Sequence, residues 1–196
     1  MKLNRIRSAP VAIEAQNNEV AWIYRPVLEF LILEAASKAP LETGGILMGY
    51  FGEPGNVPVI LSAAGPGPKA VHLRDYYRPD PVFDEAQIAT VYERSSGRIT
   101  YLGDWHTHLT PFGGLSYRDE RTLHRIARHK SARIKTPLML VLSYDGKWDV
   151  TIWQGCKAPK SRLWRRGLAV AELSSRVFSA NCFDPALNQI QWPKRF

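Results

Sequence analysis

The segment from Tyr101 to Asp119 constrains the fold of this chain more than any other part of it. It reads YLGDWHTHLTPFGGLSYRD, and we expect its first part to belong to a strand that ends at the second histidine. His106 and His108 are two positions apart, so both imidazoles leave the same face of a strand while Thr107 points to the other. Ser116 is a good N-cap residue. The segment therefore predicts a strand, a short loop and a helix in succession.

The spacing of three polar side chains in this segment predicts a metal site. Asp119 falls in the first turn of the helix that Ser116 opens, and the loop from Leu109 to Leu115 is short enough to return its carboxylate to the histidine pair. Two neutral imidazoles and one carboxylate, with a fourth position left for water, form the ligand set of a catalytic zinc. We therefore expect one Zn²⁺ per chain on His106, His108 and Asp119. The other histidines lack such company, and we assign them to structure or surface: His72, His124 and His129.

The rest of the chain alternates helices and strands without an internal repeat. Pro26 opens an expected helix to about Lys38, and Pro81 opens a second that ends near Gly97. The expected strands are Pro10–Glu14, Thr43–Phe51 paired with Val57–Ala63, Arg98–His108, Pro137–Tyr144 paired with Trp148–Trp153, and one more in the last 40 residues. This pattern predicts a mixed α/β domain.

Composition favours one ordinary globular domain. The chain has 196 residues, 45% hydrophobic and 22% charged. Its cysteines, Cys156 and Cys182, lack the CxxC spacing of a zinc knuckle, and we interpret them as cytosolic thiols. The longest apolar run, Phe30 to Leu33, is far shorter than a membrane-spanning helix, and no leader-like segment precedes it. We therefore expect a cytoplasmic protein without membrane association.

The net charge of +8 gathers toward the C-terminus. Such a patch favours nucleic acid or an acidic protein surface, whereas the simpler interpretation is a solvated basic face. No nucleic-acid-binding motif or P-loop accompanies it, so we do not expect nucleic acid as a partner. From residue 157 to the C-terminus, two acidic residues, Glu172 and Asp184, stand against eight basic ones: Lys157, Lys160, Arg162, Arg165, Arg166, Arg176, Lys194 and Arg195.

The pattern HxHxxxxxxxSxxD, preceded far upstream by Glu42 in the segment LETGGILMGY, resembles the signature of the JAMM (MPN-plus) zinc metallopeptidases. The resemblance covers roughly residues 25–153; the proline common directly after the second histidine stands two residues later, as Pro111. It implies an α/β fold, a single mixed-sheet JAMM/MPN (cytidine-deaminase-like) domain with helices flanking a central curved sheet. We place this domain at residues 1–156, with 157–196 as a basic C-terminal extension packing on it.

The resemblance also implies roles for single residues. His106, His108 and Asp119 would hold the zinc, as their spacing already indicates. Glu42 would be the general base that takes a proton from the attacking water and returns it to the leaving amine, and Ser116 would hydrogen-bond the water and the oxyanion. Taken alone, Glu42 would be interpreted as a solvent-facing loop carboxylate. The nearest rival base is Glu34, on the first expected helix.

Members of the family cleave after the C-terminal glycine of ubiquitin or a ubiquitin-like protein. The compact chain resembles their bacterial branch, deubiquitinase-like enzymes that occur beside activating and conjugating enzymes, often in anti-phage defence clusters. We expect an isopeptidase or peptidase with a ubiquitin-like substrate. Alternatives are the processing of a sulfur-carrier protein or small conjugates, and a scaffold role that five intact polar positions argue against. The irregular segment Gly65–Pro81, with Tyr76 and Tyr77, is either one wall of the substrate groove or an ordinary surface loop.

Overall fold

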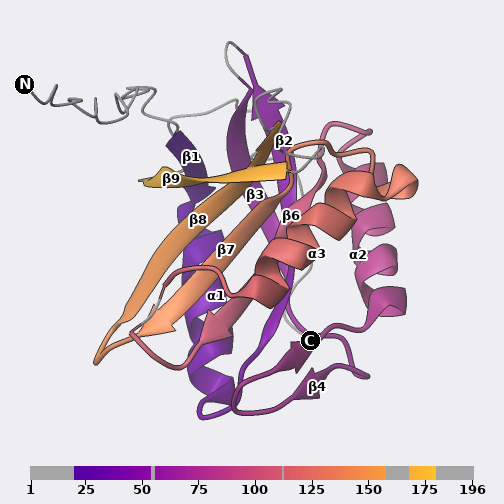
Figure 1. Ribbon diagram of the computed structural model, residues 1–196. Helices are drawn as coiled ribbons and strands as arrows, with labels where there is room; N and C mark the ends of the chain where they lie inside the picture. The colour runs from indigo at the N-terminus through magenta and orange to yellow at the C-terminus, as the bar shows by residue number, and fades with distance from the viewer. Residues whose placement is uncertain (1–19, 54–55, 112, 158–167, 180–196) are drawn as a thin grey trace, which may run out of the picture.

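The computed structural model describes residues 20–53, 56–111, 113–157 and 168–179 (Figure 1). Within these ranges the chain forms three α-helices, one short 3-10 helix at Lys130–Ala132 and nine strands. In chain order they are β1 (Val20–Tyr24), α1 (Arg25–Lys38), β2 (Gly44–Gly52), β3 (Val57–Ala64), β4 (Val71–His72), β5 (Tyr77–Arg78), α2 (Pro81–Arg94), β6 (Thr100–His108), α3 (Tyr117–Arg128), β7 (Leu138–Tyr144), β8 (Trp148–Lys157) and β9 (Leu168–Phe178).

Seven of these strands close into a mixed barrel in the order β1-β3-β2-β6-β7-β8-β9, while β4 and β5 form a separate two-stranded sheet. Closure depends on β1, which is parallel to both of its neighbours and pairs Trp22 with Val59 of β3 and with Arg176 of β9. The expected JAMM/MPN-type domain, with helices flanking a central curved sheet, is therefore wrong. The sheet is a closed barrel accompanied by few helices.

The error has a physical cause in the sequence signal. β1 is five residues long and runs directly into α1, so no turn residue separates strand from helix. Its parallel pairing joins chain segments about 150 residues apart, and side-chain periodicity within a segment carries no information about such a partner.

Other expectations about the elements are confirmed. Pro26 and Pro81 lie in the first turns of α1 and α2, both expected hairpins form, and a further strand, β9, occupies part of the last 40 residues. The expected strand Pro10–Glu14 and most of the basic C-terminal extension lie outside the described residues. Within the ranges that are described, no helix has the length and apolar character needed to cross a membrane.

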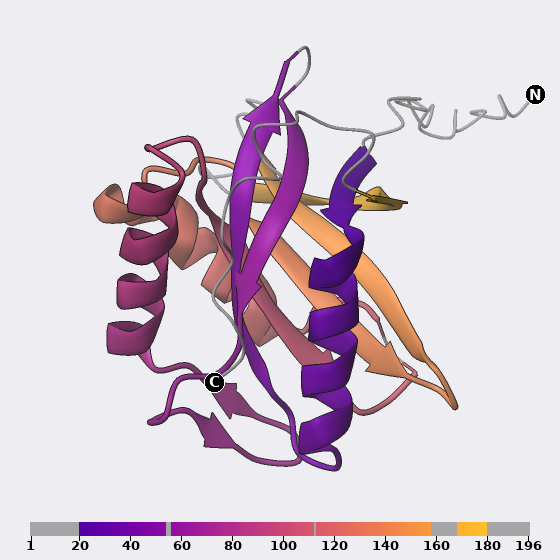
Figure 2. The same ribbon diagram turned by 180° about the vertical axis from the view of Figure 1, so that it is seen from behind.

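Both faces of β2, β3 and β7 are covered, which explains the nearly continuous apolar sequence of these strands. In β7, Leu138, Leu140 and Leu142 pack in the core cluster that α1 joins, whereas Met139 and Val141 pack with α3. A further cluster joins β2 and β3 to α2. Figures 1 and 2 show α1 on one side of the sheet, and α2 and α3 on the other.

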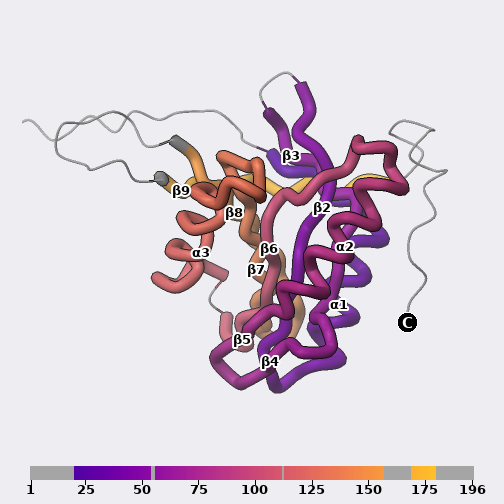
Figure 3. The backbone as a smooth tube through the Cα atoms, turned by 90° about the vertical axis from the view of Figure 1, so that its right-hand side faces the viewer, coloured from indigo at the N-terminus to yellow at the C-terminus, as the bar shows by residue number. Residues whose placement is uncertain are grey.

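Two of the candidate metal ligands, His106 and His108, lie on strand β6. In the tube view of Figure 3 it runs between α2 and α3, and it pairs with β2 and β7 on its two edges. Trp105 and Thr107 are buried, at 1% and 0% exposure, while the alternate residues His106 and His108 are only partly buried. Because successive side chains of a strand point to opposite faces, both imidazoles point away from the core.

Candidate metal centre

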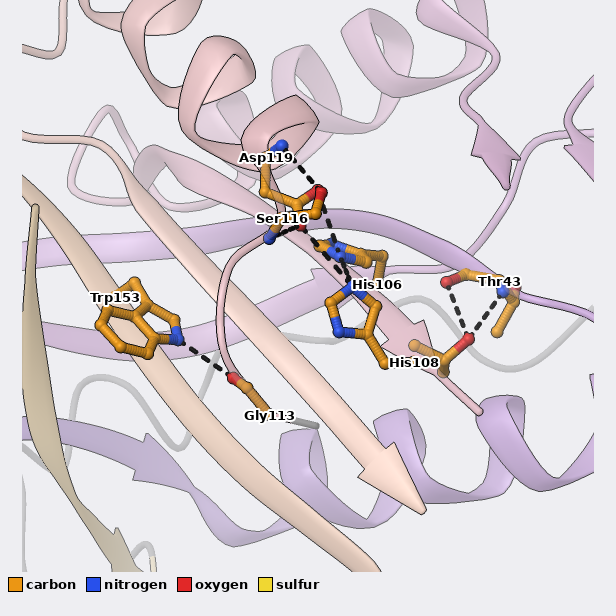
Figure 4. Close-up of polar contacts among 8 residues, drawn as sticks. Thr43, His106, His108, Gly113, Ser116, Asp119 and Trp153 are labelled. Carbon is orange, nitrogen blue, oxygen red and sulfur yellow. Dashed lines mark hydrogen bonds and ion pairs between the residues drawn. The ribbon is translucent and has the colours of Figure 1, made fainter. Parts of the chain in front are cut away.

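The two imidazoles converge at the end of β6. The Nε2 atoms of His106 and His108 are 3.0 Å apart, and the ring centroids are separated by 4.8 Å. Both rings face the start of α3 in the close-up of Figure 4. The expectation that a strand places both rings on one face is confirmed.

Asp119 reaches the same point from α3. Its Oδ1 lies 3.4 Å from Nε2 of His106, and its Oδ2 lies 3.6 Å from Nε2 of His108. A capping box orients it, because Oγ of Ser116 accepts from the Asp119 amide at 3.3 Å while Oδ2 of Asp119 accepts from the Ser116 amide at 2.8 Å. Burial opposes ionisation of the carboxyl, but its contacts with both histidines prevail and lower the pKa of Asp119 below its ordinary value. The group is therefore a carboxylate throughout the neutral range.

The three side chains lie close enough to share one metal ion. The two Nε2 atoms are 3.0 Å apart, each is 3.4–3.6 Å from a different carboxylate oxygen of Asp119, and one ligand atom from each residue falls within 4.8 Å of the others. Among the residues that the structure describes, this is the one group of three or more metal-binding side chains close enough to share an ion. Three protein ligands leave a fourth position for water or substrate, which is the arrangement of a catalytic metal site rather than a closed structural one.

Glu42 lies beside this group, just before β2. Its amide donates to the carbonyl of Leu73 at 2.7 Å, and its carbonyl lies 2.9 Å from Nδ1 of His72. Burial is the main influence on the carboxyl and raises the pKa of Glu42 above its ordinary value, opposed by His106 and His108. His72, assigned from the sequence to structure or surface, thus contacts the backbone of the candidate base. His72 and Glu42 are 30 residues apart, and no sequence motif predicts their contact.

One groove contains the whole set. Its lining includes Glu42, Ser116 and the three candidate metal ligands, together with residues of α2, α3 and the β4–β5 hairpin. Tyr76 and Tyr77 belong to this lining, so the expectation that the segment Gly65–Pro81 supplies one wall is supported. The rival base Glu34 does not line the groove.

The loop between β6 and α3 is held against the barrel. Nε1 of Trp153 donates to the carbonyl of Gly113 at 3.2 Å, as Figure 4 shows, and the amide of Tyr144 donates to the carbonyl of Thr110 at 3.3 Å. Pro111, at the point where the chain departs from the family pattern, is exposed. These contacts fix the loop on both sides of that proline and allow Asp119 to return to the histidines.

Comparisons with known proteins agree with a metal-dependent peptidase. No protein-family model matches the chain. It is 35% identical over 151 residues to "Probable metalloprotease y4qB" of Sinorhizobium fredii (strain NBRC 101917 / NGR234), a match covering 76% of this chain and 91% of that protein. It is 28% identical over 109 residues to "CD-NTase/cGAS isopeptidase" of Escherichia coli (strain TW11681), covering 56% of this chain and 69% of that protein.

A solved structure shares the fold. The solution structure of protein DSY2949 from Desulfitobacterium hafniense superposes with a TM-score of 0.56 at 16% identity, covering 82% of this chain and 93% of that one. At this identity the likeness concerns the fold alone. The extent of the match with the Sinorhizobium protein shows more, and the chain belongs to the same metalloprotease/isopeptidase family as that protein.

Proposed function

We propose that the chain is a zinc-dependent isopeptidase of the JAMM type, which hydrolyses the bond after the C-terminal glycine of a ubiquitin-like protein. The observation that carries this proposal is the convergence of His106, His108 and Asp119, whose ligand atoms lie within 4.8 Å of one another in the groove that also contains Glu42. The name of the Escherichia coli relative, an isopeptidase, supports a conjugated protein as substrate.

Zinc, when bound by His106, His108 and Asp119, would supply a Lewis acid that lowers the pKa of its water and polarises the scissile carbonyl. Glu42 would accept a proton on a carboxylate oxygen from the attacking water and deliver it to the leaving amine nitrogen. Burial supports this double role because it raises the pKa of Glu42 toward neutrality, where a group exchanges protons in both directions most effectively.

Ser116 would stabilise the oxygen that becomes negative during attack. Its Oγ already accepts the amide hydrogen of Asp119, and a hydroxyl that accepts in this way still has its own hydrogen to donate. The same capping box therefore orients the carboxylate of Asp119 and holds Ser116 at the groove. Mutually oriented groups of this kind act without reorganisation during the reaction.

The substrate and partners follow from the same proposal. A ubiquitin-like protein is the substrate, and the activating and conjugating enzymes that produce the conjugate are the associated partners. The closest alternative is a peptidase that matures the linear tail of a sulfur-carrier protein or cleaves small conjugates. The two differ in the bond attacked, which an assay can separate.

The test compares matched substrates under metal control. The zinc-loaded chain is incubated with a ubiquitin-like protein joined through its terminal glycine either to a lysine side chain or to a linear peptide, and the products are identified by mass spectrometry. We expect cleavage directly after the glycine, loss with a chelator and recovery on zinc addition. Cleavage of the linear substrate alone would favour the tail-processing alternative. Cleavage that a chelator leaves intact, or none by the zinc-loaded chain, would contradict the proposal.

A further inference from the structure

A stacked pair of side chains spans the groove beside the metal centre. The guanidinium carbon of Arg118, on α3, lies 4.7 Å from the centroid of the Tyr76 ring, in the turn between β4 and β5. Both residues line the groove that contains Glu42 and the candidate metal ligands. Arg118 is exposed and Tyr76 is half-buried. The pair therefore stands at the surface of the groove, where an entering chain would meet it.

Both ends of the pair are tied to the site. Arg118 directly precedes Asp119, whose position is fixed by the capping box at the start of α3. On the other side, the carbonyl of Tyr76 accepts from the amide of Leu73 at 2.8 Å, and the carbonyl of Leu73 accepts from the amide of Glu42 at 2.7 Å. Two consecutive backbone hydrogen bonds thus relate Tyr76 to Glu42, and the stacked pair keeps a defined position relative to the candidate base.

Stacking leaves the donors of Arg118 available. A guanidinium that rests its face on an aromatic ring presents its N–H groups outward in its own plane. Within the described part of the chain, no carboxylate or carbonyl accepts from these groups; the ring of Tyr76 is the recorded contact of the side chain. Five preoriented donors to which the described residues offer no acceptor, at the edge of a groove, are suited to the oxygen atoms of a bound chain.

We infer that Arg118 is a substrate-binding residue whose guanidinium donates to backbone carbonyl oxygens of the extended tail in the groove, and that Tyr76 is the residue that positions it. The identification of the groove as the substrate site rests on the proposed function. Tyr76 orients the planar donor before the tail arrives, so less conformational freedom is lost on binding.

The chain contains a matched control. Arg121 lies on the same helix and stacks on Tyr117 at 5.7 Å, but neither residue lines the groove. Substituting this second pair removes the same kind of charge and the same kind of contact without touching the proposed substrate site. A loss of binding seen with the Arg118 variant but not with the Arg121 variant then reflects the position of Arg118 in the groove rather than the loss of a positive charge.

The first experiment measures binding without turnover. In a zinc-loaded Glu42→Gln background, the affinity for a fluorescein-labelled peptide ending in Gly-Gly-amide is determined by fluorescence polarisation, with metal content checked for every variant. We expect Arg118→Ala to weaken binding about tenfold or more, as for the loss of hydrogen bonds from a charged donor. Arg118→Lys should recover little because it lacks the planar fork. Arg121→Ala should bind like the parent.

The positioning role of Tyr76 is tested in the same assay. Tyr76→Ala should approach the loss seen with Arg118→Ala, the double variant should lose little more, and Tyr76→Phe should rescue binding because it keeps the ring. Strictly additive losses would overturn the positioning role. Unchanged affinity in Arg118→Ala, or a parent that does not bind the peptide, would overturn the inference as a whole.

Two further comparisons separate this inference from the proposed function. A peptide with a free C-terminal carboxylate is tested beside the amide, and a loss confined to the free acid would overturn the assignment to backbone carbonyls. Hydrolysis is then measured with Glu42 restored. If cleavage proceeds equally well without Arg118, the inference fails alone. If peptide binding depends on Arg118 but the zinc-loaded chain hydrolyses no conjugate, the proposed function fails and the inference stands.

Discussion

Thr107 accepts a hydrogen bond at Oγ1 from the backbone amide of Thr43 at 2.9 Å, and its own amide donates to the carbonyl of Thr43 at 2.9 Å. Both residues are fully buried, at 0% exposure, and Figure 4 shows Thr43 beside the histidines. Thr107 separates His106 from His108, and Thr43 directly follows Glu42. The contact therefore fixes the candidate base relative to the two candidate zinc ligands.

Thr107→Val tests this connection. Valine matches the shape of threonine but leaves the buried Thr43 amide without an acceptor, which costs about 1–3 kcal/mol. We expect a lower free energy of unfolding in urea, retained zinc and a several-fold lower kcat, because small displacements of a catalytic group reduce the rate. Thr107→Ser keeps the hydroxyl and should preserve most of the activity. Equal kcat in the valine variant and the wild type would show that the contact is unnecessary for positioning.

The metal assignment predicts a specific loss of zinc. His106→Ala or His108→Ala removes one of three protein ligands, so zinc should dissociate while most of the fold remains, since the clustered core does not include these side chains. Metal analysis and circular dichroism measure the two effects. His124→Ala, on α3 but outside the metal group, should keep one zinc per chain. Full zinc occupancy in the His106→Ala/His108→Ala double variant would exclude the proposed site.

Removing the candidate base should separate metal binding from catalysis. Glu42→Gln is nearly isosteric, so zinc should stay bound while the rate falls about 10²- to 10⁴-fold, equivalent to roughly 3–5 kcal/mol of barrier. Zinc content and cleavage of one conjugate are measured on the same preparation. Glu34→Gln supplies the control, because Glu34 lies outside the groove. A normal rate in Glu42→Gln together with a large loss in Glu34→Gln would reverse the two roles.

The parts of the site that could be predicted from the sequence depend on short-range geometry. Side chains on a strand repeat every two residues, which places His106 and His108 together. At the start of a helix, the N-cap residue and the residue three positions later contact each other, which relates Ser116 to Asp119. Both relations are set within one segment, so a single sequence contains them. The position of Glu42 had no such local rule and came only from the family resemblance.

What the sequence could not reveal depends on contacts between distant segments. Barrel closure by β1 is one case. Another is Gly44, where an added Cβ would lie 2.7 Å from the Tyr77 ring and 2.5 Å from the carbonyl of Trp105. The glycine therefore lets the hairpin ring approach β2 beside the site, a packing reason invisible in the motif. In α2, the aromatic Tyr92 is 48% exposed whereas the acidic Asp84 is buried, a distribution that residue type alone does not predict.

Asp84 is a buried carboxyl group on α2, and it leads to a prediction about stability and pH. The residue is 8% exposed, and its Oδ1 has no hydrogen-bond partner among the residues that the structure describes. Burial, followed by the nearby carboxylates of Asp104 and Asp80, raises the pKa of Asp84 to about 7. The folded protein therefore holds a proton on Asp84 more tightly than the unfolded chain does.

The sign of the pH effect follows from this difference. Where the folded state binds more protons than the unfolded state, the free energy of unfolding decreases as pH rises. For Asp84 this window runs from the ordinary aspartate pKa of 3.8 to about 7, and the loss of unfolding free energy across it is at most about 4 kcal/mol. Asp84→Asn keeps the shape of the side chain but cannot ionise. We therefore expect the variant to gain stability relative to the wild type as pH rises from 4 to 8.

Urea unfolding at several pH values measures this gain. The difference in unfolding free energy between Asp84→Asn and the wild type should increase through the window and level off above pH 7. Glu85→Gln, which removes an exposed carboxylate from the neighbouring position of the same helix, should give a difference that changes little with pH. If the two variants show the same pH dependence, Asp84 ionises in the folded protein as readily as a surface carboxylate, and its burial has no electrostatic cost.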